Sequence, residues 1–303
     1  MKRSITAALL LLSTFVLGLV AHAAGPVPID AATLQNLRKR AKDHDTDVQV
    51  FLAEAFTFAL GVKVDLVQAR YWASEAASAQ VPRAMVLQAQ LMNQGLGGPK
   101  DVSQARRLGR NVAPLIKAQA EAGEPMSQAL WAWLLSEGIG VDRDDAMAFS
   151  WAAKSAKAGS AVGQNLLGTF YAGGQGVEKD QGEALLWYRA AAEQNLPQAQ
   201  HNIGRILAFA PKFKDAEEAV KWWTRAAEQN HPGAQTALGI AHQEGAGVAQ
   251  DPVTAAAWFT VAKGEDADAA RRLGEVLSKL SPEDRAKVDE KVVLLRKKLS
   301  ENR

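Results

Sequence analysis

Residues 166–200 decide the fold and read LLGTFYAGGQGVEKDQGEALLWYRAAAEQNLPQAQ. The glycines at 174 and 176 end one apolar run, and Asp180 precedes a second run in which Ala184 and Trp187 share a helical face. Glycine readily adopts the left-handed conformation that ends a helix, and aspartate caps the start of the next one. The stretch therefore predicts two antiparallel helices joined by a tight turn.

The same spacing, Asp-x3-Ala-x2-Trp, recurs along the chain. Its occurrences begin at Asp65, Asp101, Asp144, Asp180, Asp215 and Asp251. Leu108 replaces the tryptophan in the second occurrence, while Trp131, Trp133 and Trp223 fall outside the pattern. A small residue precedes each aspartate and recurs once more near the end, and we expect it to let a neighbouring helix approach closely: Ala55, Ala89, Ala132, Gly168, Gly204, Gly239 and Gly274.

The individual units differ from this pattern in ways that predict local structure. We expect left-handed residues to close the second helices at Gly159, Asn195, Asn230 and Gly264. The second unit has seven additional residues, about two helical turns, and its Pro114 is expected to kink or interrupt the helix. The fifth unit has lost its glycine turn and reads APKFK over residues 210–214.

A helix pair of this kind cannot bury its apolar face alone, so successive pairs must stack. The fold class is therefore all-α, an α/α superhelical solenoid of antiparallel helix pairs. We assign about six repeats to residues 47–277, an N-terminal capping segment to 24–46 with a helix from Asp30 to about Lys42, and a C-terminal capping helix to 278–303. In that last helix the apolar stripe of Val288, Val292, Leu295 and Leu299 is expected to close the stack. A membrane-surface or partner-binding helix is the alternative.

The first residues have the features of an export signal. Lys2 and Arg3 precede an apolar run over residues 5–20, which ends in Ala21-His22-Ala23. This order predicts a signal peptide over residues 1–23. A membrane anchor is the alternative, but the run has about 16 residues where a spanning helix needs about 20. We therefore expect a periplasmic or secreted protein with no integral membrane segment after cleavage.

Composition excludes several kinds of partner and chemistry. The 303 residues are 48% hydrophobic and 22% charged, which is typical of a folded protein. Lys and Arg number 35 and Asp and Glu 33, and Lys2 and Arg3 account for the excess. The balanced remainder gives no electrostatic reason to expect nucleic acid as a partner. Cysteine is absent, which excludes disulfides, thiolate catalysis and cysteine-based metal sites.

No motif of reactive residues follows the leader. His-Glu-x-x-His, Gly-x-Ser-x-Gly, a Walker loop and Ser-x-x-Lys are all missing, and no two histidines have ligand spacing. The Gly-x-Gly turns lie between helices, whereas a dinucleotide fingerprint follows a strand. The recurring aspartates are interpreted as helix caps rather than catalytic carboxylates. We predict no catalytic, cofactor-binding or metal site, no cofactor, and a protein that is not an enzyme.

The string from Leu166 to Gln200 resembles the Sel-one-like repeat (SLR), a relative of the tetratricopeptide repeat. The resemblance is specific over about 127–277 and weaker over about 47–126. It implies a right-handed superhelix with a concave face lined mainly by first helices, and a role as an adaptor for protein–protein contacts. Some exported bacterial relatives are linked to envelope assembly, exopolysaccharide regulation or host contact. Exported members of one branch carry a cysteine pair per repeat, which this chain lacks.

Candidate partner-binding residues follow from helical geometry. Positions three before, one after and four after the small residue should face away from the second helix. The candidates are Trp133, Asn165, Thr169, His201, Arg205, Thr236, Gln243 and Arg271. Trp133, Arg205 and Arg271 are favoured because aromatic and arginine side chains dominate interfaces. Packing of Trp133 against a neighbouring unit alone fits the spacing equally well.

Two classes of function remain. The leading hypothesis is a periplasmic, non-enzymatic adaptor that grips an unidentified protein partner of the cell envelope in the concave face. The alternative is an envelope enzyme or binding protein acting on peptidoglycan or β-lactam-like ligands, which rests only on relatives reported to bind such compounds.

Overall fold

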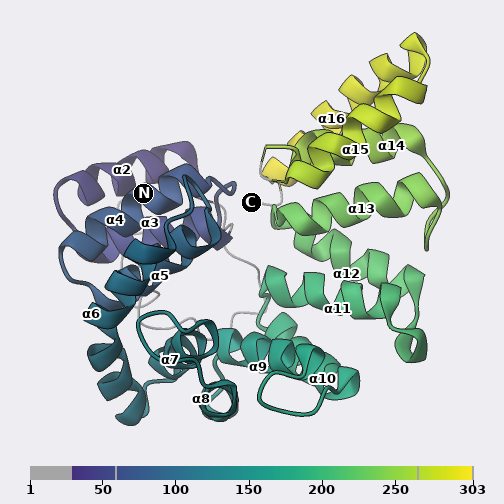
Figure 1. Cartoon of the computed structure of the whole chain (residues 1–303). Helices are drawn as coiled ribbons and strands as arrows, with labels where there is room; N and C mark the ends of the chain where they lie inside the picture. Colours follow the sequence, from purple (N-terminus) through teal and green to yellow (C-terminus); the bar gives the residue numbers. More distant parts are fainter. Residues whose placement is uncertain (1–28, 59, 265, 302–303) are drawn as a thin grey trace, which may run out of the picture.

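The computed structural model describes residues 29–58, 60–264 and 266–301. The predicted signal peptide, residues 1–23, lies outside these ranges. Within them the chain is helical, with α-helices, one short 3₁₀ helix and no strand. The helices follow one another around an open arc, with α2 near one end and α14 to α16 at the other (Figure 1). The all-α solenoid of helix pairs is therefore confirmed.

Each repeat is a hairpin of a first and a second helix. The first helices are α3 (Thr46–Phe58), α5 (Pro82–Gln94), α7 (Pro125–Glu137), α9 (Ala161–Gly173), α11 (Pro197–Phe209) and α13 (Pro232–Glu244). The second helices are α4 (Leu66–Ser78), α6 (Val102–Glu121), α8 (Asp145–Lys157), α10 (Gln181–Glu193), α12 (Ala216–Glu228) and α14 (Pro252–Ala262). First helices of neighbouring repeats pack closely on one another in three cases, namely α3 with α5, α5 with α7 and α7 with α9. No two second helices of the described residues pack as closely. The first helices therefore lie on the inner side of the arc.

The recurring aspartates close the hairpins in two ways. Each side chain caps its second helix, as predicted. Each backbone N–H also donates to a first-helix carbonyl at 2.8 to 3.1 Å, three residues beyond the small residue in five repeats. In the first repeat Asp65 donates to Phe56, so the equivalent small residue is Ala53. The expected register of Ala55 is therefore wrong by two residues.

Three small residues make room for an aromatic ring. A Cβ at Gly168 would lie 2.8 Å from Tyr188, and one at Gly204 would overlap Trp223. Gly239 receives Phe259 in the same way. Each ring belongs to the residue directly after the tryptophan of the repeating Asp-x3-Ala-x2-Trp pattern. Trp223, which falls outside that pattern, is therefore a buried packing residue. Gly274 has no such neighbour and is exposed, so its expected packing role is wrong.

The second glycine of each glycine turn packs on the preceding repeat. Gly176 has a φ of 68°, and a Cβ there would overlap the carbonyl oxygen of Asp145 in the first turn of α8. Gly97, Gly140 and Gly247 approach the backbone of the preceding second helix equally closely. A turn that contacts backbone directly leaves no room for a side chain, which explains the recurring pair of glycines.

Buried glutamines also join the repeats. In four of the six first helices a glutamine donates its Nε2 to a carbonyl eight residues earlier, at the end of the preceding helix, over 2.8 to 3.5 Å. The pairs are Gln49 with Ala41, Gln128 with Ala120, Gln164 with Ala156 and Gln235 with Ala227. Each of these carbonyls also accepts the backbone N–H three residues further along the chain, so the glutamine adds a second bond at the helix end.

Two expectations about helix ends and interruptions fail. Gly159, Asn195 and Asn230 have positive φ, as predicted, but Gly264 does not, because α14 ends at Ala262 and Lys263 follows in a right-handed conformation. A kink or an interruption is expected at Pro114, and the interruption does not occur, because α6 runs continuously for 20 residues. The proline ring is on the exposed side, while residues 112, 113 and 116 are buried and hold the helix against the core.

The fifth repeat replaces its glycine turn by the 3₁₀ helix Pro211–Phe213. Ala210 is extended there and Asp215 still caps α12, so the hairpin closes without a left-handed glycine. Phe209, at the end of α11, is 75% exposed.

Both ends of the array carry additional helices. Asp30 caps α2 (Ala31–Lys42), close to the expected bounds. At the other end α15 (Ala267–Lys279) continues the stack, and α16 (Pro282–Glu301) lies along α14. The stripe expected to close the stack packs inward, with Val288, Val292 and Leu299 buried and Leu295 partly so. Because α16 covers it, α14 is buried on nearly all sides.

Candidate interaction surface

The accessible side chains of the first helices α9 and α11 lie at equivalent positions on their inner side, which we call the inner face. On α9 the partly exposed positions include Asn165, Leu166 and Thr169, and the positions between them are buried. Positions 201, 202 and 205 of α11 repeat the pattern. The face therefore contains the predicted positions and a further row, two residues before the small residue, that the sequence analysis did not include. Helical geometry places that row on the same side. On α9, for example, Leu166 is one residue from the predicted Asn165 and three residues, about one turn, from the predicted Thr169.

The middle of this face is uncharged. Helix α9 has no charged residue, and Glu137 at the last position is the one charge of α7. We define the central band as Leu130, Trp133, Asn165, Leu166, Thr169 and Asn202, all partly buried. Its apolar members pack against the core cluster that joins α5 to α9, so the band is part of a rigid surface.

Amides and hydroxyls in the band are linked across repeats. The Asn202 amide donates to Oδ1 of Asn165 over 3.2 Å, from α11 to α9. The Thr169 hydroxyl donates to the Asn165 carbonyl at 3.0 Å and accepts from the Tyr188 hydroxyl at 3.1 Å. These bonds orient the polar groups and leave part of each side chain accessible. The predicted residues Asn165 and Thr169 are therefore brought together, beside Trp133.

His201 contributes an uncharged ring next to the band. Its imidazole stacks on that of His231, the N-cap residue of α13, with ring centroids 4.8 Å apart. Burial lowers the pKa of His201 to about 3, with the charges of His231 and Arg205 adding to the effect, and burial lowers the pKa of His231 to about 4. Gly233 has no side chain and leaves room for both rings, whose Cε1 atoms would lie 3.3 Å from a Cβ there. Both imidazoles are neutral at pH 7.

The other predicted residues differ in accessibility. Arg205 is exposed and makes no hydrogen bond or ion pair among the described residues. Thr236 is buried, and its hydroxyl donates to Asp266 of the next helix pair over 2.7 Å, so it does not belong to the accessible face. Arg271 is exposed but pairs at 2.5 Å with Asp268 and with Glu275.

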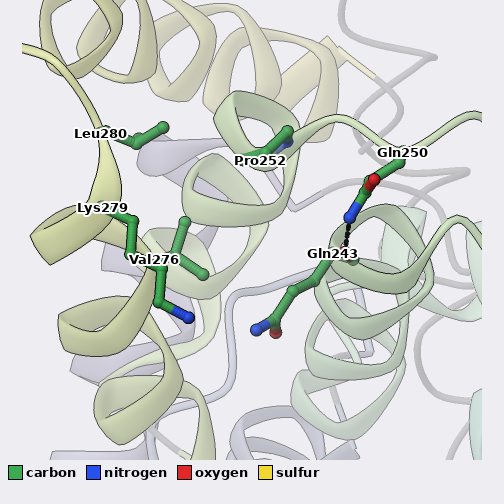
Figure 2. Close-up of a pocket in the computed structure, with 6 residues that line it drawn as sticks. All are labelled: Gln243, Gln250, Pro252, Val276, Lys279 and Leu280. Atoms are coloured by element: carbon green, nitrogen blue, oxygen red, sulfur yellow. Dashed lines mark hydrogen bonds between the residues drawn. The ribbon is translucent and has the colours of Figure 1, made fainter.

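Gln243 lines a small open hollow near the end of the array. The hollow, of about 230 Å³, lies between α13, α14 and α15 and is drawn in Figure 2. Besides Gln243 it is lined by Gln250, Pro252, Val276, Lys279 and Leu280. The Gln250 amide donates to the backbone carbonyl of Gln243 at 2.9 Å. The hollow has no reactive group apart from the exposed Lys279 amine.

Among the described residues no three His, Asp or Glu side chains lie close enough to hold a metal ion. No helix between residues 29 and 301 is long and apolar enough to cross a bilayer.

A family model described as the Sel1 repeat matches residues 46–81, 82–110, 125–160, 161–196, 197–231 and 232–262. The chain belongs to the Sel1 repeat family. Proteins of this family generally mediate protein–protein interaction and are typically non-enzymatic scaffolds. No curated protein matches the sequence.

Several solved structures are similar to this Sel1 repeat protein. A protective antigen of uropathogenic Escherichia coli strains with an SLR fold is 24% identical over 88% of this chain and 64% of its own, with a TM-score of 0.38. This chain thus spans less than two thirds of that antigen. A Sel1 repeat protein from Oxalobacter formigenes is 25% identical over 77% and 94%, with a TM-score of 0.47. An immunity protein from Pseudomonas aeruginosa is 17% identical over 75% and 87%, with a TM-score of 0.48.

Proposed function

We propose that this Sel1 repeat protein is an exported, periplasmic, non-enzymatic adaptor that holds a protein partner against the inner face of its first helices. The observation that carries the proposal is the central band, a rigid and uncharged surface shared by three consecutive repeats. Family membership supports a protein partner, since Sel1 repeats generally mediate such contacts.

The chemistry of the central band defines the partner segment. Leu130, Trp133 and Leu166 offer apolar contact area, and the amides of Asn165 and Asn202 offer donors and acceptors to a peptide backbone. A charged side chain buried against α9 would find no opposite charge on that helix, and the basic group beside the band is the exposed Arg205 of α11, one turn from Asn202. The part of the segment that crosses α7 and α9 is therefore apolar and uncharged.

Photocrosslinking in cells tests the inner face. p-Benzoylphenylalanine is placed at position 169 in the central band or at position 186 on α10, where Leu186 is 61% exposed. We expect discrete crosslinked products from position 169 and none from 186. Leu166→Glu should abolish the products, whereas the matched outer substitution Leu186→Glu should leave them unchanged. Products of equal yield from both positions would contradict the proposal.

Export is tested separately. Osmotic-shock fractions of cells producing a C-terminally tagged chain are analysed by mass spectrometry. We expect a periplasmic species that begins at Ala24, and a cytoplasmic one when residues 2–23 are deleted. An intact N-terminus in the cytoplasmic fraction would refute export without bearing on the inner face.

A further inference from the structure

Helix α6 has an unusual charge for this protein. Its residues 102–121 contain four basic side chains and one acid, Glu121, whose carboxylate lies 3.8 Å from Lys117. We define the basic stripe as Arg106, Arg107 and Arg110, which are all exposed. Within the described part of the chain none of the three forms an ion pair or a hydrogen bond. The pKa of Asp101 is lowered first by the hydrogen bonds that its Oδ1 accepts from Gln104 and from Ser103, and only last by the charge of Arg107.

Elsewhere in the described ranges six arginines pair with carboxylates: Arg40, Arg83, Arg143, Arg189, Arg271 and Arg272. Three of these, Arg143, Arg189 and Arg271, are exposed. The basic stripe differs from other exposed arginines without a carboxylate, such as Arg205, because it places three guanidinium groups within five residues. Like charges one turn apart on a helix repel each other. Arg106 and Arg110 stand in that relation, with Arg107 between them. The stripe therefore destabilises the free protein slightly, and an opposite charge placed over it would remove that repulsion.

The same helix departs from the repeat in length. The other second helices have at most 13 residues, whereas α6 has 20. The match to the repeat stops at residue 110 and resumes at residue 125. Figure 1 shows α6 at the outer margin of the arc, beyond α5. The extension thus enlarges the outer surface next to the stripe, away from the central band.

We propose that the basic stripe docks an acidic segment of a protein partner. A guanidinium group presents paired donors that match both oxygens of a carboxylate, so three arginines suit Asp or Glu side chains spaced along a helix or loop. Contacts of this kind at an exposed surface increase association rate and fix orientation, and they weaken with salt. A membrane surface fits less well, because a helix that binds lipid inserts large apolar side chains beside its basic residues. The exposed positions around the stripe are Ser103, Asn111 and Pro114, and Leu115, five residues beyond Arg110, is the single large apolar side chain exposed on α6.

The test measures binding of a fluorescein-labelled 14-residue peptide, seven of whose residues are glutamate, to the purified protein by anisotropy. The stripe variant combines Arg106→Glu, Arg107→Glu and Arg110→Glu. The control makes the same change of charge at exposed lysines of three other repeats, through Lys157→Glu, Lys179→Glu and Lys221→Glu. We expect the dissociation constant to rise at least tenfold in the stripe variant and less than twofold in the control. Raising the salt from 25 to 300 mM should weaken wild-type binding at least tenfold.

Circular dichroism establishes that both triple variants fold. If the stripe variant does not, Arg106→Gln with Arg110→Gln replaces it, with an expected weakening of at least threefold. Equal effects of stripe and control variants would overturn the proposal, as would equal binding of a peptide with glutamine in place of glutamate. Stripe-dependent binding to vesicles containing 30% phosphatidylglycerol, tighter than to the peptide, would assign the stripe to a membrane instead. A dimer of the wild-type protein that the stripe variant loses would assign it to a second copy of the chain.

Discussion

Alanine substitutions at three glycines separate backbone strain from packing between repeats. Gly159, Gly174 and Gly176 all have positive φ, of 86°, 73° and 68°. A Cβ at Gly159 has nothing within 4 Å, and one at Gly174 would lie 3.3 Å from the Cβ of Lys179. At Gly176 it would overlap the Asp145 carbonyl oxygen, which is backbone and cannot turn aside. The three sites thus share the strain and differ in the obstruction.

The expected costs follow from this difference. Left-handed strain in a residue with a Cβ costs about 1 kcal/mol, which sets the loss of unfolding free energy for Gly159→Ala. Gly174→Ala should lie close to that value, because the neighbouring Cβ needs to move only a few tenths of an ångström. Gly176→Ala adds an overpacking cost of about 1–3 kcal/mol, for a total of about 2–4 kcal/mol. That additional cost belongs to the contact between the third and fourth repeats.

Urea unfolding followed by both circular dichroism and tryptophan fluorescence measures these costs. Gly176→Ala should also separate the two transitions, since weakening one interface of a repeat array uncouples the units on either side. In the Gly159→Ala variant the transitions should coincide. If Gly176→Ala is within about 0.5 kcal/mol of Gly159→Ala, the turn does not hold the repeats together and the reasoning is refuted.

Three further outcomes are expected. Trp223→Ala should reduce the unfolding free energy in denaturant melts by about 3–5 kcal/mol, because the Trp223 ring is buried against Gly204. Trp222→Ala should reduce it by roughly 1 kcal/mol. Equal losses in the two variants would contradict this packing. Folding lowers the pKa of His201 to about 3 and that of the stacked His231 to about 4. Below pH 6.5 the unfolded chain therefore binds more protons than the folded chain. The free energy of unfolding should consequently fall between pH 6.5 and 4, by at most about 1.4 kcal/mol per pH unit for each histidine. Replacing both histidines by Asn should flatten this pH dependence, and an unchanged slope in melts at pH 7 and 5 would rule it out. Asp144→Ala should cost about 1 kcal/mol through loss of the α8 cap, measured by thermal melting against the exposed control Asp142→Ala.

The hairpin order of the solenoid could be predicted from the sequence because it rests on local backbone chemistry. The Asp180 side chain accepts hydrogen bonds from the first turn of its own helix, and Gly174 adopts a left-handed conformation at the end of its own helix. Neither depends on contacts with other repeats. Errors arose where tertiary packing decides. Pro114 predicts a kink or an interruption, but α6 is not interrupted, because the buried residues on either side of the proline hold the helix against the core.

The rotation of one helix against its partner could not be derived from spacing. It decides that Trp223, and not Trp222, fills the space beside Gly204. The inner face was predicted in outline, and Asn165 and Thr169 lie there. Accessibility, however, depends on the following repeat, and Thr236 is covered because Asp266 bonds to its hydroxyl. The sequence indicates that α14 is covered by a further helix, because its residues 255–257 are three consecutive alanines, whereas the other second helices carry charged residues.

The placement of α16 has a consequence for how the array ends. Because this helix lies along the flank of α14 instead of pairing closely with α15, it does not occupy the position where another hairpin would stack. Helix α15 carries a cluster of ion pairs, with Arg271 bridged to Asp268 and Glu275 and Arg272 bridged to Asp268. Stacking of a further hairpin over these pairs would have to strip water from their charges, which costs free energy.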